Sequence, residues 1–288
     1  MKTLLLSLIL IGVALTASLG QTNASATSFS QSVLTDSVYS TILNRKVATT
    51  IILPQNYDPT KSYPVFYLLH RWAGNNQSFL KSSLIAELND KPLIVVTPSA
   101  DTSWYVNSFS NPASRYEDFM MQELVPYMDK KYRTDTSRQA IGGFSMGGFG
   151  ALQLGLKHPE RFKFIADISG PINPPFSDVP LTPKSPLHII KNSVQVSFGD
   201  AKSAVSTSSN VFRLIQSIPA STPLFIYMAV GRQDQFDFII PQHQLFVDAL
   251  KKQKVNYQYT EYEGGHFDGK VLAACLPTLL AKLMDTLN

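Results

Sequence analysis

A serine between two glycines is the residue around which this 288-residue chain could do chemistry. Ser145 is the middle residue of 143–147, GFSMG, a G-x-S-x-G pattern, and Asp234 and His266 follow it in the chain. A serine hydroxyl is a weak nucleophile at neutral pH, so it needs a histidine as general base, and that histidine needs a carboxylate to orient it. The three residues therefore predict nucleophilic catalysis through a covalent acyl intermediate.

The residues on either side of Ser145 predict a strand, a sharp turn and a helix, in that order. An apolar run, 139–144, leads into the serine, and an apolar-periodic segment, 151–156, follows it. Glycines at 143 and 147 let the strand and the helix approach closely, and a serine on so sharp a turn is expected to have strained backbone. Its hydroxyl would lie at the carboxyl edge of a sheet, over the positive end of the helix. The alternative is a glycine-rich turn that only packs closely.

The base and the acid are each expected just after a strand. His266 follows an alternating segment, 255–262, and Asp234 follows an apolar run, 223–230. Asp237, on the same loop, and Asp167, at the end of the predicted strand 162–168, are the alternative acids. The other histidines are expected to be structural; they are His70, His158, His188 and His243, the last on a helix surface.

Stabilisation of a tetrahedral oxyanion requires two converging main-chain N–H groups. Met146 follows the nucleophile and supplies the first. The second is expected in the loop after the buried run 63–70, from Trp72 or else from Arg71. Trp104 and Tyr105 lie in an aromatic and polar loop after the predicted strand 93–98, and we expect them at the same edge of the sheet, in the substrate pocket.

The remaining pattern predicts an α/β fold. Two β-branched stretches, 32–43 and 46–53, are broken at Asn44-Arg45 and predict an antiparallel pair at the N-terminal edge. Later apolar runs alternate with helical patterns, which predicts a mostly parallel central sheet with helices on both faces. Pro126 predicts a kink or an early end in the helical segment 115–130. Residues of about 170–222, rich in proline and serine, are expected to cover the site.

The first residues have the layout of a secretory signal peptide. Lys2 precedes an apolar run, 4–17, and small residues follow, so cleavage is expected after Gly20 or after Ala26. Residues 1–26 would then be leader and lead-in, and 27–288 one exported domain, secreted or periplasmic. The apolar run is too short for a comfortable membrane span, so no stable membrane insertion is expected.

Composition excludes several other functions. The net charge is +4, and the cations form no stripe with aromatic residues, so nucleic-acid binding is not expected. Neither HExxH nor paired CxxC is present, so we expect no metal and no cofactor. The one cysteine, Cys275, lies in an apolar helical stretch and is expected to be a buried thiol. Nothing in the sequence predicts the oligomeric state.

Five blocks of sequence resemble, in the family order, the esterase D family of α/β-hydrolases. They are YPVFYLLHRWAGNNQSF, SWYVNS, IGGFSMGGFGALQLGLKHPERF, VGRQDQFD and EYEGGHF. That family includes S-formylglutathione hydrolases, feruloyl and acetyl xylan esterases, and antigen 85-type mycolyltransferases. The resemblance implies the α/β-hydrolase fold, with Ser145, Asp234 and His266 as the triad. It also implies Met146 and Trp72 as the oxyanion donors.

Two departures from the family pattern lie near the expected substrate site. Arg71 stands where the family usually has glycine, and Phe267 follows His266 where members commonly have a tryptophan nearby. Both are therefore further substrate-pocket candidates.

The sequence thus predicts a secreted serine carboxylesterase acting on short-chain esters or on acyl groups of extracellular carbohydrate. An acyltransferase to a carbohydrate hydroxyl is the alternative on the same triad. A non-catalytic binding module is the alternative of another class, although the presence of all three triad residues argues against it.

Overall fold

The computed structural model of the chain describes residues 33–89, 91–174 and 187–288. The predicted leader, 1–26, lies outside the described residues, as does part of the predicted covering segment. No helix in the described ranges is both long and apolar enough to cross a membrane.

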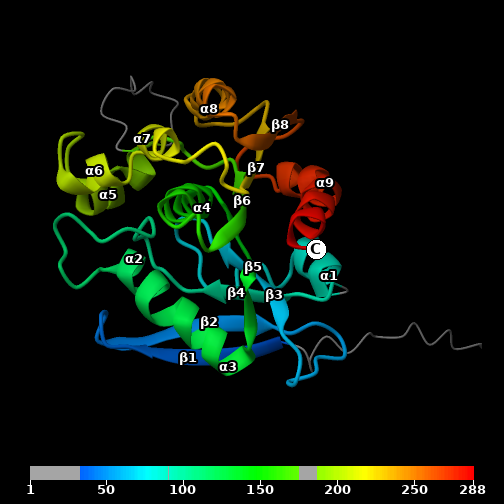
Figure 1. Cartoon of the computed structure of the whole chain (residues 1–288). Helices are drawn as coiled ribbons and strands as arrows, with labels where there is room; N and C mark the ends of the chain where they lie inside the picture. The colour runs from blue at the N-terminus through cyan, green and yellow to red at the C-terminus, as the bar shows by residue number, and fades with distance from the viewer. Residues whose placement is uncertain (1–32, 90, 175–186) are drawn as a thin grey trace, which may run out of the picture.

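The described strands form one eight-stranded sheet in the order β1-β2-β4-β3-β5-β6-β7-β8 (Figure 1). The strands are β1 (Val33–Ser40), β2 (Arg45–Ile52), β3 (Tyr63–Leu69), β4 (Ile94–Pro98), β5 (Thr134–Phe144), β6 (Phe162–Ile168), β7 (Phe225–Gly231) and β8 (Asn256–Tyr262). β1 pairs antiparallel with β2, and β2 with β4, while every pairing from β4 to β8 is parallel. The predicted parallel sheet with an antiparallel N-terminal edge is confirmed.

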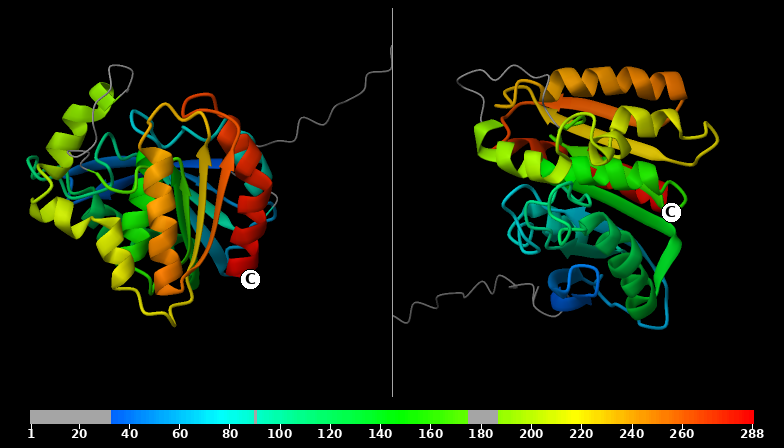
Figure 2. Two further views of the ribbon diagram at one scale, coloured as in Figure 1. Left: turned by 90° about the horizontal axis from the view of Figure 1, so that it is seen from above. Right: turned by 90° about the vertical axis from the view of Figure 1, so that its left-hand side faces the viewer.

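Helices cover both faces of this sheet. They are α1 (Ser83–Asn89), α2 (Tyr116–Asp118), the π-helix η2 (Phe119–Leu124), α3 (Val125–Tyr132), α4 (Met146–Lys157), α5 (Leu187–Phe198), α6 (Ala204–Ser208), α7 (Val211–Gln216), α8 (Ile239–Gln253) and α9 (Lys270–Leu287). α8 and α9 lie on opposite faces (Figure 2). Because successive strand residues point to opposite faces, Ile165 packs in the α4 and α8 layer, and Phe164 packs with α1 and α9.

The helical segment that contains Pro126 stays continuous but changes its winding. Pro126 stands in the first turn of α3, directly after the π-helix η2. Proline has no N–H to donate and its ring crowds the preceding turn, so a wider turn at this point accommodates it. The predicted irregularity at Pro126 therefore takes the form of a π-helical turn.

The single cysteine is part of the core on the α9 face. Cys275 is 0% exposed, and burial raises the pKa of its thiol to about 12. A thiol needs its thiolate form to react as a nucleophile, so Cys275 is an inert packing residue, as predicted.

Backbone strain collects where the parallel strands end. The residues with φ in the left-handed region include Ala73 after β3, Asp101, Trp104 and Tyr105 after β4, Ser145 after β5, and Ser169 after β6. Non-glycine residues rarely adopt this conformation, and those that do are concentrated at functional sites. A functional site is therefore expected at the carboxyl edge of the sheet.

Candidate active site

Ser145 lies on the sharp turn between β5 and α4. Its φ of 56° and ψ of −119° are strained values, and its N–H donates to the carbonyl of Ile168 at 2.9 Å. A Cβ atom at Gly147 would overlap the carbonyl oxygen of Leu69 on β3, and one at Gly143 would overlap Gly147 itself. Both glycines are thus required by close backbone contact, which explains the G-x-S-x-G pattern.

A chain of hydrogen bonds joins Ser145, His266 and Asp234. The distance from Ser145 Oγ to His266 Nε2 is 2.8 Å, and that from His266 Nδ1 to Asp234 Oδ2 is 3.0 Å. Because an ionised carboxylate only accepts, Nδ1 carries the proton and Nε2 is left to accept from the serine. Asp234 Oδ1 accepts in turn from the N–H of Phe236 at 2.9 Å, which fixes the carboxylate.

The two alternative acids lie elsewhere. Asp237 is exposed, and no hydrogen bond joins it to His266 among the contacts of the described residues. Asp167 is fully buried and contacts His243, with 3.0 Å between Oδ2 and Nε2. Our expectation that His243 lies on a helix surface is wrong, because α8 turns this residue toward the sheet and buries it completely.

The loop after β3 is held by His70. Its Nε2 accepts the N–H of Ala100 at 2.8 Å, so Nδ1 carries the proton and donates to the carbonyl of Arg71 at 2.8 Å. The N–H of Gly74 donates to the same carbonyl at 2.9 Å. In a trans peptide the N–H points away from the preceding carbonyl, so these bonds fix the direction of the Trp72 N–H.

Burial lowers the pKa of His70 and is only partly opposed by its bond to Arg71. The ring is therefore held neutral, the form that can accept from Ala100. His70 is thus structural, as expected, because its two hydrogen bonds order this loop. Met146 is the first residue of α4, so its N–H has no acceptor within the helix and is left for other partners.

Comparisons with known proteins show the family to which the chain belongs. The Esterase family model matches residues 40–274 of the chain. The chain belongs to this family. The resemblance to esterase D-type enzymes is thereby confirmed, and the protein is a carboxylic ester hydrolase.

Individual relatives cover this esterase to different extents. An acetyl esterase of Caldicellulosiruptor saccharolyticus is 28% identical over 243 residues, which are 79% of this chain and 89% of that protein. An endo-1,4-beta-xylanase/feruloyl esterase of Xylanibacter ruminicola is 31% identical over 139 residues, 42% of this chain and 19% of that protein. The match thus spans about a fifth of that larger relative. A solved ferulic acid esterase superposes with a TM-score of 0.70 at 24% identity, covering 89% and 98% of the two chains, and shows the shared fold.

Aromatic side chains surround the histidine of the esterase. The ring of His266 lies 4.7 Å from Phe236, 5.3 Å from Phe144 and 5.1 Å from Phe267, measured between centroids. His266 is only 4% exposed, whereas Phe267 is 63% exposed. Phe267 therefore presents an apolar surface to solvent beside the histidine.

Trp104 and Tyr105 do not line the substrate pocket, contrary to our expectation. They are 1% and 0% exposed, because the left-handed turn at these two residues directs both rings into the core. Trp104 packs edge-on against Phe149 and Phe198. The Tyr105 hydroxyl donates to the carbonyl of His70 at 3.2 Å, so this side chain stabilises the loop after β3 from within the core.

Arg71 and Trp72 differ in surroundings although they are neighbours. Arg71 is exposed, and its guanidinium contacts the carbonyl of Trp72 at 3.4 Å. The indole N–H of Trp72 donates to Ser193 on α5 at 2.9 Å. Sequence reasoning missed Ser193, since it lies in a segment without a recognisable motif and 121 residues from its partner.

The described part of the chain holds no group of three or more His, Cys, Asp or Glu side chains placed to bind a metal ion.

Proposed function

We propose that Ser145, His266 and Asp234 are the catalytic triad of this esterase. The observation that carries the proposal is the hydrogen-bonded chain from Ser145 Oγ through His266 to Asp234. Its order matches the roles that ester cleavage needs, with a nucleophile, a base within reach of its proton, and an acid that orients the base.

In the proposed reaction, His266 Nε2 takes the proton of Ser145 as Oγ attacks the ester carbonyl carbon. The resulting imidazolium is stabilised by Asp234 and returns the proton to the leaving alcohol oxygen when the ester C–O bond breaks. Water then attacks the acyl-enzyme by the same route and releases the carboxylic acid. The rings of Phe144 and Phe236 exclude water around His266, which strengthens its interaction with Asp234.

The N–H groups of Met146 and Trp72 are the proposed oxyanion donors. Two features support them: Met146 opens α4, and hydrogen bonds to the Arg71 carbonyl fix the Trp72 peptide. The positive end of α4 adds to the stabilisation of negative charge at this position. The N–H of Arg71 is the alternative second donor.

The proposed substrates are short-chain acyl esters and acylated carbohydrates. The names of two relatives, an acetyl esterase and a xylanase/feruloyl esterase, support this class.

We further propose that residues 1–26 are a leader and that 27–288 act outside the cytoplasm as one domain, with 170–222 covering the site. Sequencing the N-terminus of the exported protein tests the two predicted cleavage positions, Gly20 and Ala26.

Labelling with a fluorophosphonate probe and mapping of the adduct tests the triad. We expect one adduct, on Ser145, and its loss in Ser145→Ala and in His266→Ala when both variants keep the circular dichroism of the parent. An adduct on another serine would overturn the assignment.

Adding acceptor sugars to the p-nitrophenyl acetate reaction distinguishes hydrolysis from acyl transfer, because transfer produces an acetylated sugar in place of acetate.

A further inference from the structure

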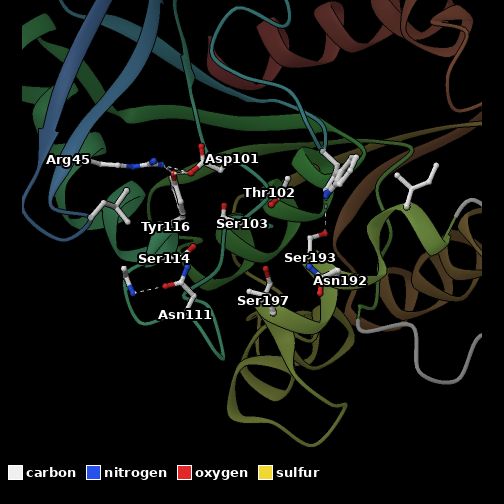
Figure 3. Close-up of a pocket in the computed structure, with 15 residues that line it drawn as sticks. Arg45, Asp101, Thr102, Ser103, Asn111, Ser114, Tyr116, Asn192, Ser193 and Ser197 are labelled. Atoms are coloured by element: carbon white, nitrogen blue, oxygen red, sulfur yellow. Dashed lines mark hydrogen bonds and ion pairs between the residues drawn. The ribbon is translucent and has the colours of Figure 1, made fainter.

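A polar pocket of about 530 Å³ opens beside the loop that carries Trp72 (Figure 3). Its walls come from the turn between β1 and β2, Trp72 in the loop after β3, the loop between β4 and α2, and helix α5. Arg45, Asp101 and Tyr116 lie at one end, and Asn192 and Ser193 at the other. The volume falls in the range of small-molecule sites.

The chemistry of the lining suits a neutral ligand with many hydroxyl groups. Of the fifteen lining residues, ten are charged or carry a hydroxyl or amide group. The two charges, on Arg45 and Asp101, are paired with each other, and the Tyr116 hydroxyl donates to the same carboxylate at 2.8 Å. The lining therefore has no net charge, and its remaining amides and hydroxyls can both donate and accept.

The pocket walls are fixed rather than loosely apposed. The Phe109 N–H donates to the Ser197 carbonyl at 2.9 Å, and the Ser108 hydroxyl donates to the Val196 carbonyl at 2.8 Å. Both bonds tie the loop after β4 to the end of α5. Asp101 adopts a left-handed φ of 48°, which places its carboxylate in the lining at a cost in backbone strain.

The pocket is contiguous with the proposed oxyanion loop. Trp72 belongs to both, through its main chain in the loop and its side chain in the lining. Ser103, another lining residue, is followed by Trp104, whose ring packs on Phe149, one turn beyond Ser145 in α4. Trp72 is thus the residue that joins the pocket to the proposed oxyanion loop beside Ser145.

We propose that the pocket binds a neutral sugar ring of an acylated carbohydrate while its ester group lies at Ser145. The proposal rests on the function proposed above, and it assigns the polar part of the substrate to a defined site. The sugar hydroxyls exchange hydrogen bonds with Asn111, Asn192 and Asp101, and the half-buried indole of Trp72 covers its C–H groups.

The test compares two acetates that share the acyl group, ethyl acetate and a mono-acetylated methyl β-xyloside. In the double variant Asn111→Ala/Asn192→Ala, the ratio of kcat/KM for the sugar ester to kcat/KM for ethyl acetate should fall about tenfold, as expected for two lost hydrogen bonds. Gln195→Ala is the matched control, since Gln195 is an exposed amide on α5 outside the lining. An unchanged ratio in the double variant, or an equal fall in the control, overturns the proposal.

A binding measurement keeps this test separate from the proposed catalysis. Methyl β-xyloside is titrated into Ser145→Ala and followed by tryptophan fluorescence, to which Trp72 contributes. A saturable change that weakens in the triple variant with Asn111→Ala and Asn192→Ala supports the pocket, and no saturable change overturns it. Loss of the proposed function appears instead as ethyl acetate turnover that survives Ser145→Ala.

Discussion

The hydroxyl of Ser193 on α5 accepts a hydrogen bond from the indole N–H of Trp72 at 2.9 Å. The same oxygen accepts the indole N–H of Trp104 at 3.2 Å and donates to the carbonyl of Ile190 at 2.8 Å. One hydroxyl thus joins α5 to the two loops that follow β3 and β4. The Trp72 side chain is therefore held from α5, in addition to the hydrogen bonds that fix its peptide.

Ser193→Ala should lower kcat for p-nitrophenyl acetate about tenfold with a smaller change in KM. The substitution leaves two indole N–H groups without this acceptor, at roughly 1–3 kcal/mol for each buried group, and frees the Trp72 loop. Ser193→Thr keeps the hydroxyl and should restore most of the rate. If Ser193→Thr is as slow as Ser193→Ala, the hydrogen bonds are not the cause.

The identity of the acid is decided by comparing Asp234→Asn with Asp237→Asn. An asparagine at 234 no longer holds the histidine in the required tautomer, so kcat should fall about 10³- to 10⁴-fold. Asp237 is exposed and should tolerate the change within about twofold, since surface substitutions usually have small effects. Steady-state kinetics with p-nitrophenyl acetate gives both values. A greater loss in Asp237→Asn would reverse our assignment.

Acid should destabilise the fold in part through His70. Burial lowers the pKa of its ring from the usual 6.5, so the unfolded chain takes up a proton between pH 6.5 and the lower folded pKa while the folded chain does not. The free energy of unfolding therefore decreases as pH falls below about 6.5 and levels off below the folded pKa.

Urea unfolding at pH 7.5 and at pH 5.5 measures this dependence. His70→Gln lacks the titrating ring, so its loss of stability between the two pH values should be smaller than that of the parent. Equal losses in the two proteins would show that other groups carry the acid sensitivity.

The buried pair of Asp167 and His243 should contribute to stability and not to turnover. His243 Nδ1 donates to the Ile239 carbonyl at 2.8 Å, so one further proton must lie between its Nε2 and Asp167. Asp167→Ala leaves a buried histidine without its partner and should cost about 3–5 kcal/mol in the free energy of unfolding.

Asp167→Asn is the matched control for this pair. The asparagine amide can donate to neutral His243 and its oxygen can still accept the Gly170 N–H, as Asp167 does at 2.8 Å, so the loss should be clearly smaller. Its kcat should stay close to that of the parent. A collapse of kcat in a stable Asp167→Asn protein would bring this residue back as a candidate acid.

The parts of the site that the sequence predicted correctly are those encoded by local pattern. The strand, turn and helix around Ser145 follow from a continuous run of residues, and the placement of Asp234 and His266 follows from where β7 and β8 end. The carboxyl ends of parallel strands lie at the same edge of the sheet, so residues far apart in sequence could be expected to meet there. Their actual pairing still required the structure.

What the sequence could not predict depends on packing between distant segments. Trp104 and Tyr105 have the composition of pocket residues, but positive φ angles that no local pattern announces turn them inward. His243 was assigned to the wrong face, because the partner that buries it, Asp167, is 76 residues away. The polar pocket was missed for the same reason, since its walls come from four separate parts of the chain.

Because Cys275 is buried, the rate at which thiol reagents label it measures local unfolding of the esterase at α9. Thiol reagents react with the thiolate, and in the folded chain the Cys275 thiol lies buried between α9 and the sheet and has a pKa of about 12. The Cys275 thiol is therefore modified only when α9 separates from the sheet. Because the sequence contains one cysteine, the labelling rate has a single source and records how frequently the α9 face unfolds under native conditions.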